Sequence, residues 1–401
     1  MRIIYPTDIL IPRVKDLTAW SVVACDQFTS QPEYWTAAEE RAGEAPSALR
    51  LILPEAWLDT PRADGADARI AETMDTYLSS GIFEEMKDCF LYLERTQPDG
   101  RIRRGLMAAL DLEQYDFAPG NRAGVRATEG TVEERLPPRI RIRSGAALEM
   151  PHTMVLMDDR DDRVLGPLEN ARHRMKKVYD FDLMLHGGHV TGWRVDGVLR
   201  DTVQATLDSL ADPDLQREKY GAAAEQGPMP FAVGDGNHSL AAAKRYWEQL
   251  RETLSEGERA VHPARFSLVE LGNIHEDALD FEPIHRVIFD TDTAAWETEF
   301  NRSRAGWEDS SRTIGERVNA ADAFCREYIA AHGGHVDYIH GDETARELGS
   351  RPGCGAVILP PVEKDGLFTS VLTGGALPRK SFSMGHAEDK RYYLECRRIR
   401  P

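Results

Sequence analysis

The stretch from Phe231 to Lys244 constrains the fold most, because a short apolar run there meets two glycines and then a helical pattern. Phe231-Ala232-Val233 is apolar, and Gly234-Asp235-Gly236 follows it directly. Beyond the glycines, apolar residues recur at the spacing of one helix face, among them Leu240, Trp247 and Leu254. We therefore predict a buried strand, a tight turn and an amphipathic helix, in that order.

Two interpretations of this turn stay open. In the first, the glycines let the backbone approach a ligand, and N–H groups at the start of the helix face a phosphate or carboxylate. Asp235 would then hold a metal ion or accept a proton, and His238 would donate a hydrogen bond to phosphate or shuttle a proton. In the second, Asn237 or Ser239 only caps the helix and the glycines only make the turn.

The remaining chain alternates strand and helix patterns, which predicts an α/β fold (mixed α+β) with mixed sheets and flanking helices. Cys89 to Glu94 and Arg103 to Leu112 flank Pro98-Asp99-Gly100 and predict a β-hairpin. Another apolar run, Phe266 to Leu271, follows the central helix. Residues 231–271 are therefore expected to form a β-α-β unit with a right-handed crossover, in a sheet that is at least partly parallel.

Length and charge limit the classes of protein that remain. With 401 residues, the chain exceeds the size that one core usually serves, and we expect lobes at 1–120, 121–300 and 301–401, the middle one carrying the Asp-Gly-Asn-His motif. The net charge of −18 repels nucleic acid and anionic membranes. The basic runs at 139–143 and 396–400 are short, so nucleic-acid binding is not expected.

Targeting signals and metal-binding cysteine patterns are not expected either. No apolar run approaches the length of a membrane span, and the first residues do not follow the pattern of a signal peptide, so we expect a cytoplasmic protein. The five cysteines lie far apart, which indicates neither a disulfide framework nor a zinc site.

Three further positions carry groups suited to chemistry on a charged small molecule. Glu129 lies on a polar segment, residues 120–138, read as a loop, and could deprotonate a substrate hydroxyl if the fold brings it to the central turn. Arg286 and the pair Arg379-Lys380 could contact an anion. The alternatives are a solvated glutamate, a structural arginine and a solvated turn.

The order of these motifs resembles a bacterial and archaeal family, the domain-of-unknown-function family ten-fifteen, over nearly the whole chain, 1–401. The resemblance rests on seven segments: Arg50 to Pro54, Gly105 to Ala109, Glu129 to Thr131, Tyr179 to Phe181, Gly234 to His238, Ile284 to Val287 and Leu377 to Ser381. Its central motif is similar to the phosphate-binding motif of free serine kinases and is related to the nucleotide site of ParB-like proteins and sulfiredoxin. The resemblance thus implies a ParB/sulfiredoxin-like β-turn-α unit.

The resemblance also implies roles for single residues. Glu129 would be the catalytic base and His238 a second catalytic residue, with ADP or ATP as the nucleotide and Mg²⁺ held by Asp235. By the resemblance, Asp235, Gly236 and His238 would hold the phosphates. The residues expected to bind the cofactor are Gly234, Asp235, Gly236, Asn237, Ser239, Arg286, Arg379 and Lys380, the last three as replacements for a missing positive charge.

This chain departs from the family pattern at three positions. Asn237 stands in place of a histidine, Ser239 in place of an arginine, and Thr128 in place of a histidine before the loop glutamate. The missing arginine would have supplied a charge-assisted bond to phosphate of about 1.5–3 kcal/mol.

Three functions therefore stay open, and the oligomeric state with them. The first is a kinase-like enzyme that transfers phosphate from a nucleotide to a hydroxylated metabolite such as serine. The second is a non-catalytic regulator that binds a nucleotide or metabolite at a degenerate site. The third is a scaffold without a small ligand.

Overall fold

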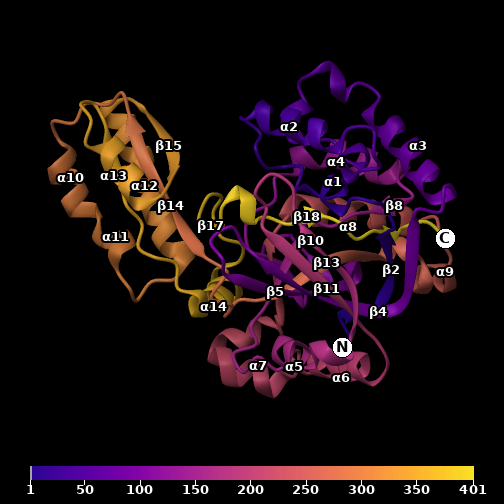
Figure 1. Cartoon of the computed structure of the whole chain (residues 1–401). Coiled ribbons are helices and arrows are strands. Elements are labelled where there is room, and N and C mark those ends of the chain that lie inside the picture. The colour runs from indigo at the N-terminus through magenta and orange to yellow at the C-terminus, as the bar shows by residue number, and fades with distance from the viewer. Residues whose placement is uncertain (1) are drawn as a thin grey trace.

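A mixed sheet of eleven strands organises the computed structural model, which describes residues 2–401 (Figure 1). The strand order is β10-β11-β4-β5-β13-β9-β12-β7-β6, with β1 beside β5 and β2 beside β4. The predicted hairpin is confirmed, because β4 and β5 pair antiparallel. The strands are β1 Ile4–Tyr5, β2 Thr7–Pro12, β4 Phe83–Thr96, β5 Ile102–Asp111, β6 Tyr115–Asp116, β7 Val125–Ala127, β9 Met154–Met157, β10 Lys176–Asp182, β11 His189–Val195, β12 Phe231–Asp235 and β13 Phe266–Asn273.

A smaller sheet and two short strand pairs complete the β structure. The smaller sheet has the order β15-β14-β16, with β17 beside β14, and its helices form a separate lobe (Figure 1). The short pairs, β3 with β18 and β8 with β19, join the end of the chain to its first half. The bounds are β3 Val22–Val23, β8 Leu148–Glu149, β14 Phe281–Phe289, β15 His335–His340, β16 Gly355–Val357, β17 Phe382–Met384, β18 Tyr392–Tyr393 and β19 Arg397–Arg398.

Helices cover both faces of the large sheet. Alternate residues of a strand point to opposite faces, so apolar side chains on both faces need to be buried. On β4, Leu91 and Leu93 join the core cluster that contains Trp20, whereas Phe90 and Tyr92 join the cluster beneath α5, α6 and α8. The predicted mixed α/β class is confirmed. The helices are α1 Leu17–Trp20, α2 Pro32–Ala42, α3 Ala66–Ser79, α4 Leu136–Gly145, α5 Leu165–Ala171, α6 Gly197–Ser209, α7 Pro213–Tyr220, α8 Asn237–Arg251, α9 Glu256–Val261, α10 Trp296–Ser303, α11 Ala305–Glu308, α12 Ile314–His332, α13 Asp342–Gly349 and α14 Lys364–Gly374.

The predicted strand, turn and helix are confirmed as β12 and α8, and packing explains both glycines between them. A side chain at Gly234 would place its Cβ 2.7 Å from Met384 Sδ. Gly236 has a φ of +77°, and a Cβ there would lie 2.9 Å from Thr153 Cα. The glycines are therefore required by neighbouring parts of the protein, whether or not a ligand approaches them.

The expected β-α-β unit is wrong in its strand direction. β9 lies between β12 and β13, antiparallel to β12 and parallel to β13, so β12 and β13 run in opposite directions. The expectation counted one helix between the two strands. The chain also forms α9, which begins at a capping box made by Ser255 and Glu258.

The parallel pairing of β7 with β12 brings predicted site residues to one edge of the sheet. The segment 120–138, expected to be a loop, contains β7, which pairs in parallel with β12. Thr128 anchors the end of this pair by donating a hydrogen bond from Oγ1 to the carbonyl of Val233, at 2.6 Å. Because neighbouring parallel strands end at the same edge of a sheet, Glu129 and Asp235 are delivered to one edge.

Candidate functional site

A polar cavity of about 330 Å³ lies at this edge of the large sheet. Its volume is within the range typical of small-molecule pockets. All of the predicted site residues line it except Arg286, namely Glu129, Gly234, Asp235, Gly236, Asn237, His238, Ser239, Arg379 and Lys380. The fold thus brings the loop glutamate and the central turn into one cavity.

The N-terminus of helix α8 forms one wall of this cavity. Its N-cap is Gly236, no side chain caps the first turn, and that turn carries no acidic residue. The interpretation that Asn237 or Ser239 caps the helix is therefore wrong. Within residues 2–401, the buried Oδ1 of Asn237 also has no hydrogen-bond partner. Uncapped N–H groups at a helix start carry partial positive charge and favour an anion.

The charged side chains around the cavity add to this positive potential. Five cations face four carboxylates, although the whole chain has a net charge of −18. The cations are Arg135, Arg139, Arg379, Lys380 and Lys390, and the carboxylates are Asp26, Glu55, Glu129 and Asp235. A local excess of cations in an acidic protein is suited to a phosphate or carboxylate ligand.

Lys390 neutralises Asp235. Its Nζ lies 3.2 Å from Asp235 Oδ2, while Oδ1 accepts a hydrogen bond from the N–H of Gly236 at 3.0 Å. Both oxygens of the predicted metal ligand are thus engaged. Within residues 2–401, no group of three or more acidic, histidine or cysteine side chains is arranged to hold a metal ion.

Glu129 has the properties of a base in a partly dry environment. Burial raises the pKa of its carboxyl, while a backbone hydrogen bond from Lys380 and the charge of Arg379 oppose the rise. Arg379 Nε lies 3.8 Å from Oε1. The loop is fixed against the C-terminal segment, because Leu377 donates its N–H to the carbonyl of Thr128 at 2.8 Å. A raised pKa strengthens a carboxylate as an acceptor of a hydroxyl proton.

His238 is neutral in this arrangement. Burial and the nearby charges of Arg139, Arg135 and Arg379 lower its pKa to about 4. Nε2 accepts a hydrogen bond from the N–H of Val132 at 3.2 Å, so the ring hydrogen is assigned to Nδ1. A neutral ring fits the predicted role of hydrogen-bond donor, and its low pKa does not fit a proton shuttle near neutral pH.

Arg286 supports the site from behind and does not line the cavity. It is fully buried, and its Nε lies 2.7 Å from Asp322 Oδ1. Nη1 donates to the carbonyl of Lys380 at 3.1 Å. Lys380 has a φ of +61°, which is uncommon for a residue other than glycine. Arg286 is therefore a positioning residue for the Arg379-Lys380 turn.

Several residues of the cavity were missed from the sequence. Lys390 follows no periodic pattern, Asp26 lies in a turn, and Glu55 begins a short 3-10 helix, Glu55–Trp57. The basic run at 139–143 carries only a weak nucleic-acid signal in the sequence, whereas in the structure Arg139 lines the cavity and Arg143 pairs with Glu149 at 2.7 Å. This run was the one local signal that could have pointed to the site.

Comparisons with known proteins identify the family. The model of the family described as "Protein of unknown function (DUF1015)" matches residues 4–398, and the chain therefore belongs to this family. None of the curated proteins matches the chain. A solved structure titled "Free serine kinase in complex with AMP" is similar at 9% identity with a TM-score of 0.36, covering 72% of this chain and 90% of that one. A likeness this distant establishes neither a shared fold nor a shared activity.

Proposed function

We propose that this member of the DUF1015 family binds a nucleotide, ADP or ATP, in the polar cavity and transfers a phosphoryl group to the hydroxyl of a small metabolite. One observation carries the proposal. Glu129, the uncapped start of α8 and five cationic side chains line the same cavity. Phosphoryl transfer needs mainly positioning and neutralisation of charge, which such a set supplies.

In the proposed reaction, the phosphate oxygens lie against the first N–H groups of α8 and the side chains of Arg379, Lys380 and Lys390. The acceptor hydroxyl loses its proton to Glu129. Its oxygen forms a bond to the terminal phosphorus, and the bond from that phosphorus to the bridging oxygen breaks. The nucleotide leaves with one phosphate fewer.

The surroundings of the Asp235 carboxylate suit the ammonium of Lys390 better than a permanently bound metal ion. A Mg²⁺ ion and the ammonium of Lys390 are alternatives at Asp235 Oδ2, which the ammonium now contacts at 3.2 Å. Mg²⁺ commonly enters such sites on the phosphates of a nucleotide, with one or two carboxylates and several waters. Nucleotide binding is therefore to be measured with and without Mg²⁺.

The second candidate is a regulator that binds the nucleotide without transfer. The Asp235–Lys390 pair favours it, because a carboxylate that is already neutralised contributes less to charge development during transfer. The two candidates share the binding step and differ only in turnover.

The test separates binding from turnover with a matched pair of variants. Glu129→Gln should keep nucleotide affinity, measured by calorimetry, and lose transfer of labelled terminal phosphate to a panel of hydroxylated metabolites that includes serine. Glu134→Gln, an exposed glutamate on the same segment, is the control and should behave as the wild type. Transfer that persists in Glu129→Gln removes Glu129 from the mechanism. Binding without any transfer selects the regulator, and no binding of ADP, ATP, CTP or GTP rejects both candidates.

A further inference from the structure

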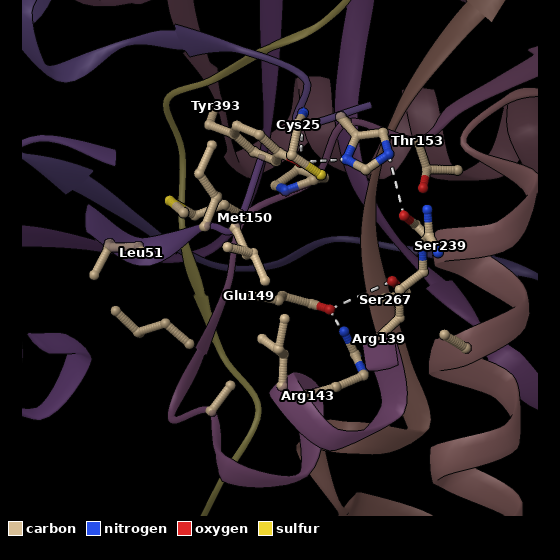
Figure 2. Close-up of a pocket in the computed structure, with 18 of the residues that line it drawn as sticks. Cys25, Leu51, Arg139, Arg143, Glu149, Met150, Thr153, Ser239, Ser267 and Tyr393 are labelled. Carbon is tan, nitrogen blue, oxygen red and sulfur yellow. Dashed lines mark hydrogen bonds and ion pairs between the residues drawn. The ribbon is translucent and has the colours of Figure 1, made fainter. Parts of the chain in front are cut away.

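A second cavity, of about 180 Å³, adjoins the polar one. The two share three lining residues, Glu55, Arg139 and Ser239, and the ion pair between Glu55 and Arg139 lies at their boundary. The second cavity lies among α3, α4, the start of β9 and α8. Figure 2 shows Leu51 and Met150 across the space from Thr153 and Ser239.

The wall of this apolar chamber is mostly hydrocarbon. Its apolar lining residues are Leu51, Ile52, Leu53, Leu58, Met74, Ile142, Ala146, Leu148, Met150, Ala242 and Leu268. The one buried carboxylate in the wall, Glu149, is neutralised by Arg143 at 2.7 Å and Arg397 at 2.9 Å, and it accepts the N–H of Leu268 at 2.8 Å. Its charge is thus satisfied by the protein, and the chamber suits an apolar group.

Polar groups occur where the chamber meets the polar cavity. Ser239 Oγ lies 3.1 Å from Nε2 of the buried His152, whose Nδ1 lies 2.6 Å from the hydroxyl of Tyr393. The Tyr393 oxygen accepts the N–H of Cys25 at 3.3 Å, so its own hydrogen is available to His152 Nδ1.

The directions of these hydrogen bonds decide whether the Ser239 hydroxyl acts as a donor or as a nucleophile. With Nδ1 accepting from Tyr393, the neutral imidazole carries its hydrogen on Nε2 and donates it to Ser239 Oγ. With the hydrogen assigned to Nε2, which also lies 3.9 Å from Asp26 Oδ2, His152 is not placed to take the proton of Ser239, and this argues against a serine nucleophile. The Ser239 hydroxyl keeps its hydrogen and can donate it to a polar atom of a ligand at the junction.

We propose that the apolar chamber binds the apolar end of the acceptor, with the polar end of that molecule held at Ser239 beside the polar cavity. A cavity of about 150 Å³ lined by apolar side chains takes up benzene. The acceptor is thus a hydroxylated compound with an apolar group of about benzene size, larger and less polar than serine. That this ligand is the phosphoryl acceptor rests on the proposed function, whereas its binding in the chamber does not.

The experiment uses 2-phenylethanol as the probe and a matched pair of substitutions on α4. Ile142 is half-buried and lines the chamber, so Ile142→Trp should fill it and weaken binding of the probe at least tenfold. Ile140, two residues earlier, packs against the core beneath α8, and Ile140→Trp should leave the affinity within twofold. Leu58→Trp is a second filling variant, since Leu58 lines the chamber and is 40% exposed. All affinities are measured by calorimetry on the full chain.

A further variant tests the polar junction. Ser239→Ala should weaken 2-phenylethanol about fivefold, the value of one neutral hydrogen bond, and leave ethylbenzene unchanged. The proposal is overturned if the wild type does not bind 2-phenylethanol, or if both filling variants bind it as the wild type does. Failure of the proposed function gives a different result, because the filling variants then still weaken probe binding at least tenfold while ATP binds to no form of the protein.

Discussion

Two charged regions of this molecule use the same residue types and treat them in opposite ways. Behind the site, Arg103 and Arg391 are buried with Glu270, at 3.3 and 3.2 Å, and Arg391 also pairs with Glu395. The fully buried Arg95 donates to main-chain carbonyls, among them that of Asp389 at 2.9 Å. We call this group the buried arginine cluster. Its charges are paired with one another inside the protein, although Arg391 Nε and both carboxylate oxygens of Glu270 have no hydrogen-bond partner within residues 2–401.

The polar cavity leaves part of its positive charge without an ion partner, whereas Arg139 pairs with Glu55 and Lys390 with Asp235. Within residues 2–401, the side chains of Arg135 and Lys380 make no ion pair within 4.0 Å, and Arg379 reaches Glu129 only at 3.8 Å. The two regions are connected, because Arg95 and Arg103 hold the carbonyl of Asp389, next to Lys390. The buried arginine cluster therefore positions Lys390, one of the cations of the polar cavity.

The largest effect is expected from breaking the buried arginine cluster. Arg391→Met leaves Glu270 and Glu395 buried without their main counter-ion, which should lower the free energy of unfolding by about 3–5 kcal/mol. Arg379→Met is the control in the cavity. Its side chain is 46% exposed, and its loss should cost less than about 0.5 kcal/mol. Urea unfolding of both variants checks this, and equal losses would contradict the division between the buried arginine cluster and the polar cavity.

The second-largest effect is expected at Lys390, which lies next to the carbonyl held by Arg95 and Arg103. Lys390→Met removes an ammonium from the cavity and should weaken nucleotide binding about 10- to 100-fold, since a hydrogen bond to a charged group contributes about 1.5–3 kcal/mol. Lys176→Met, at an exposed lysine that pairs with Glu84, is the control and should leave the affinity unchanged. Calorimetric titration with ATP measures both. Unaltered binding by Lys390→Met would show that the ammonium serves only Asp235.

The sequence predicts features that depend on neighbouring residues, and it does not predict contacts between segments that lie far apart in the chain. The strand, turn and helix around Gly234 to Ser239 depend on local periodicity and turn chemistry, and they were predicted correctly. The parallel pairing of β7 with β12, and the insertion of β9 beside β12, depend on strand order, which no local pattern encodes. The ion pair between Lys390 and Asp235 likewise joins distant parts of the chain, and no local pattern predicts it.

Arg286 shows the limit most clearly. Its residue type and its position before an apolar strand are the same for an arginine that binds phosphate and for one that holds a backbone carbonyl. Only the buried contacts with Asp322 and Lys380 decide between the two roles. Sequence reasoning therefore found nine of the residues that line the cavity and could not separate residues that face a ligand from residues that support them.

A smaller effect is expected at Glu129, a carboxylate of the polar cavity. Its pKa is raised by burial, so the folded protein keeps the proton at pH values where an unfolded glutamate, with a pKa of 4.5, has lost it. Stability then falls as the pH rises through this interval. Glu129→Gln should therefore be more stable than the wild type at pH 7, and the difference should vanish below pH 4.5. Thermal unfolding across this range checks the sign, and a wild type that is more stable at pH 7 would contradict it.

The last effect is expected at His238, away from neutral pH, and has the opposite sign. Burial and neighbouring arginines lower its pKa from 6.5 to about 4, so the unfolded chain binds a proton near pH 6.5 that the folded chain refuses. Stability is then complete at pH 7 and falls as the pH drops from 6.5 to 4. His238→Gln has no such titration, and its melting temperature relative to the wild type should rise over that interval. Because other titrating groups are common to both proteins, a constant difference in Tm from pH 7 to pH 4 would mean that His238 is solvated rather than held neutral against Val132 and the cations of the cavity.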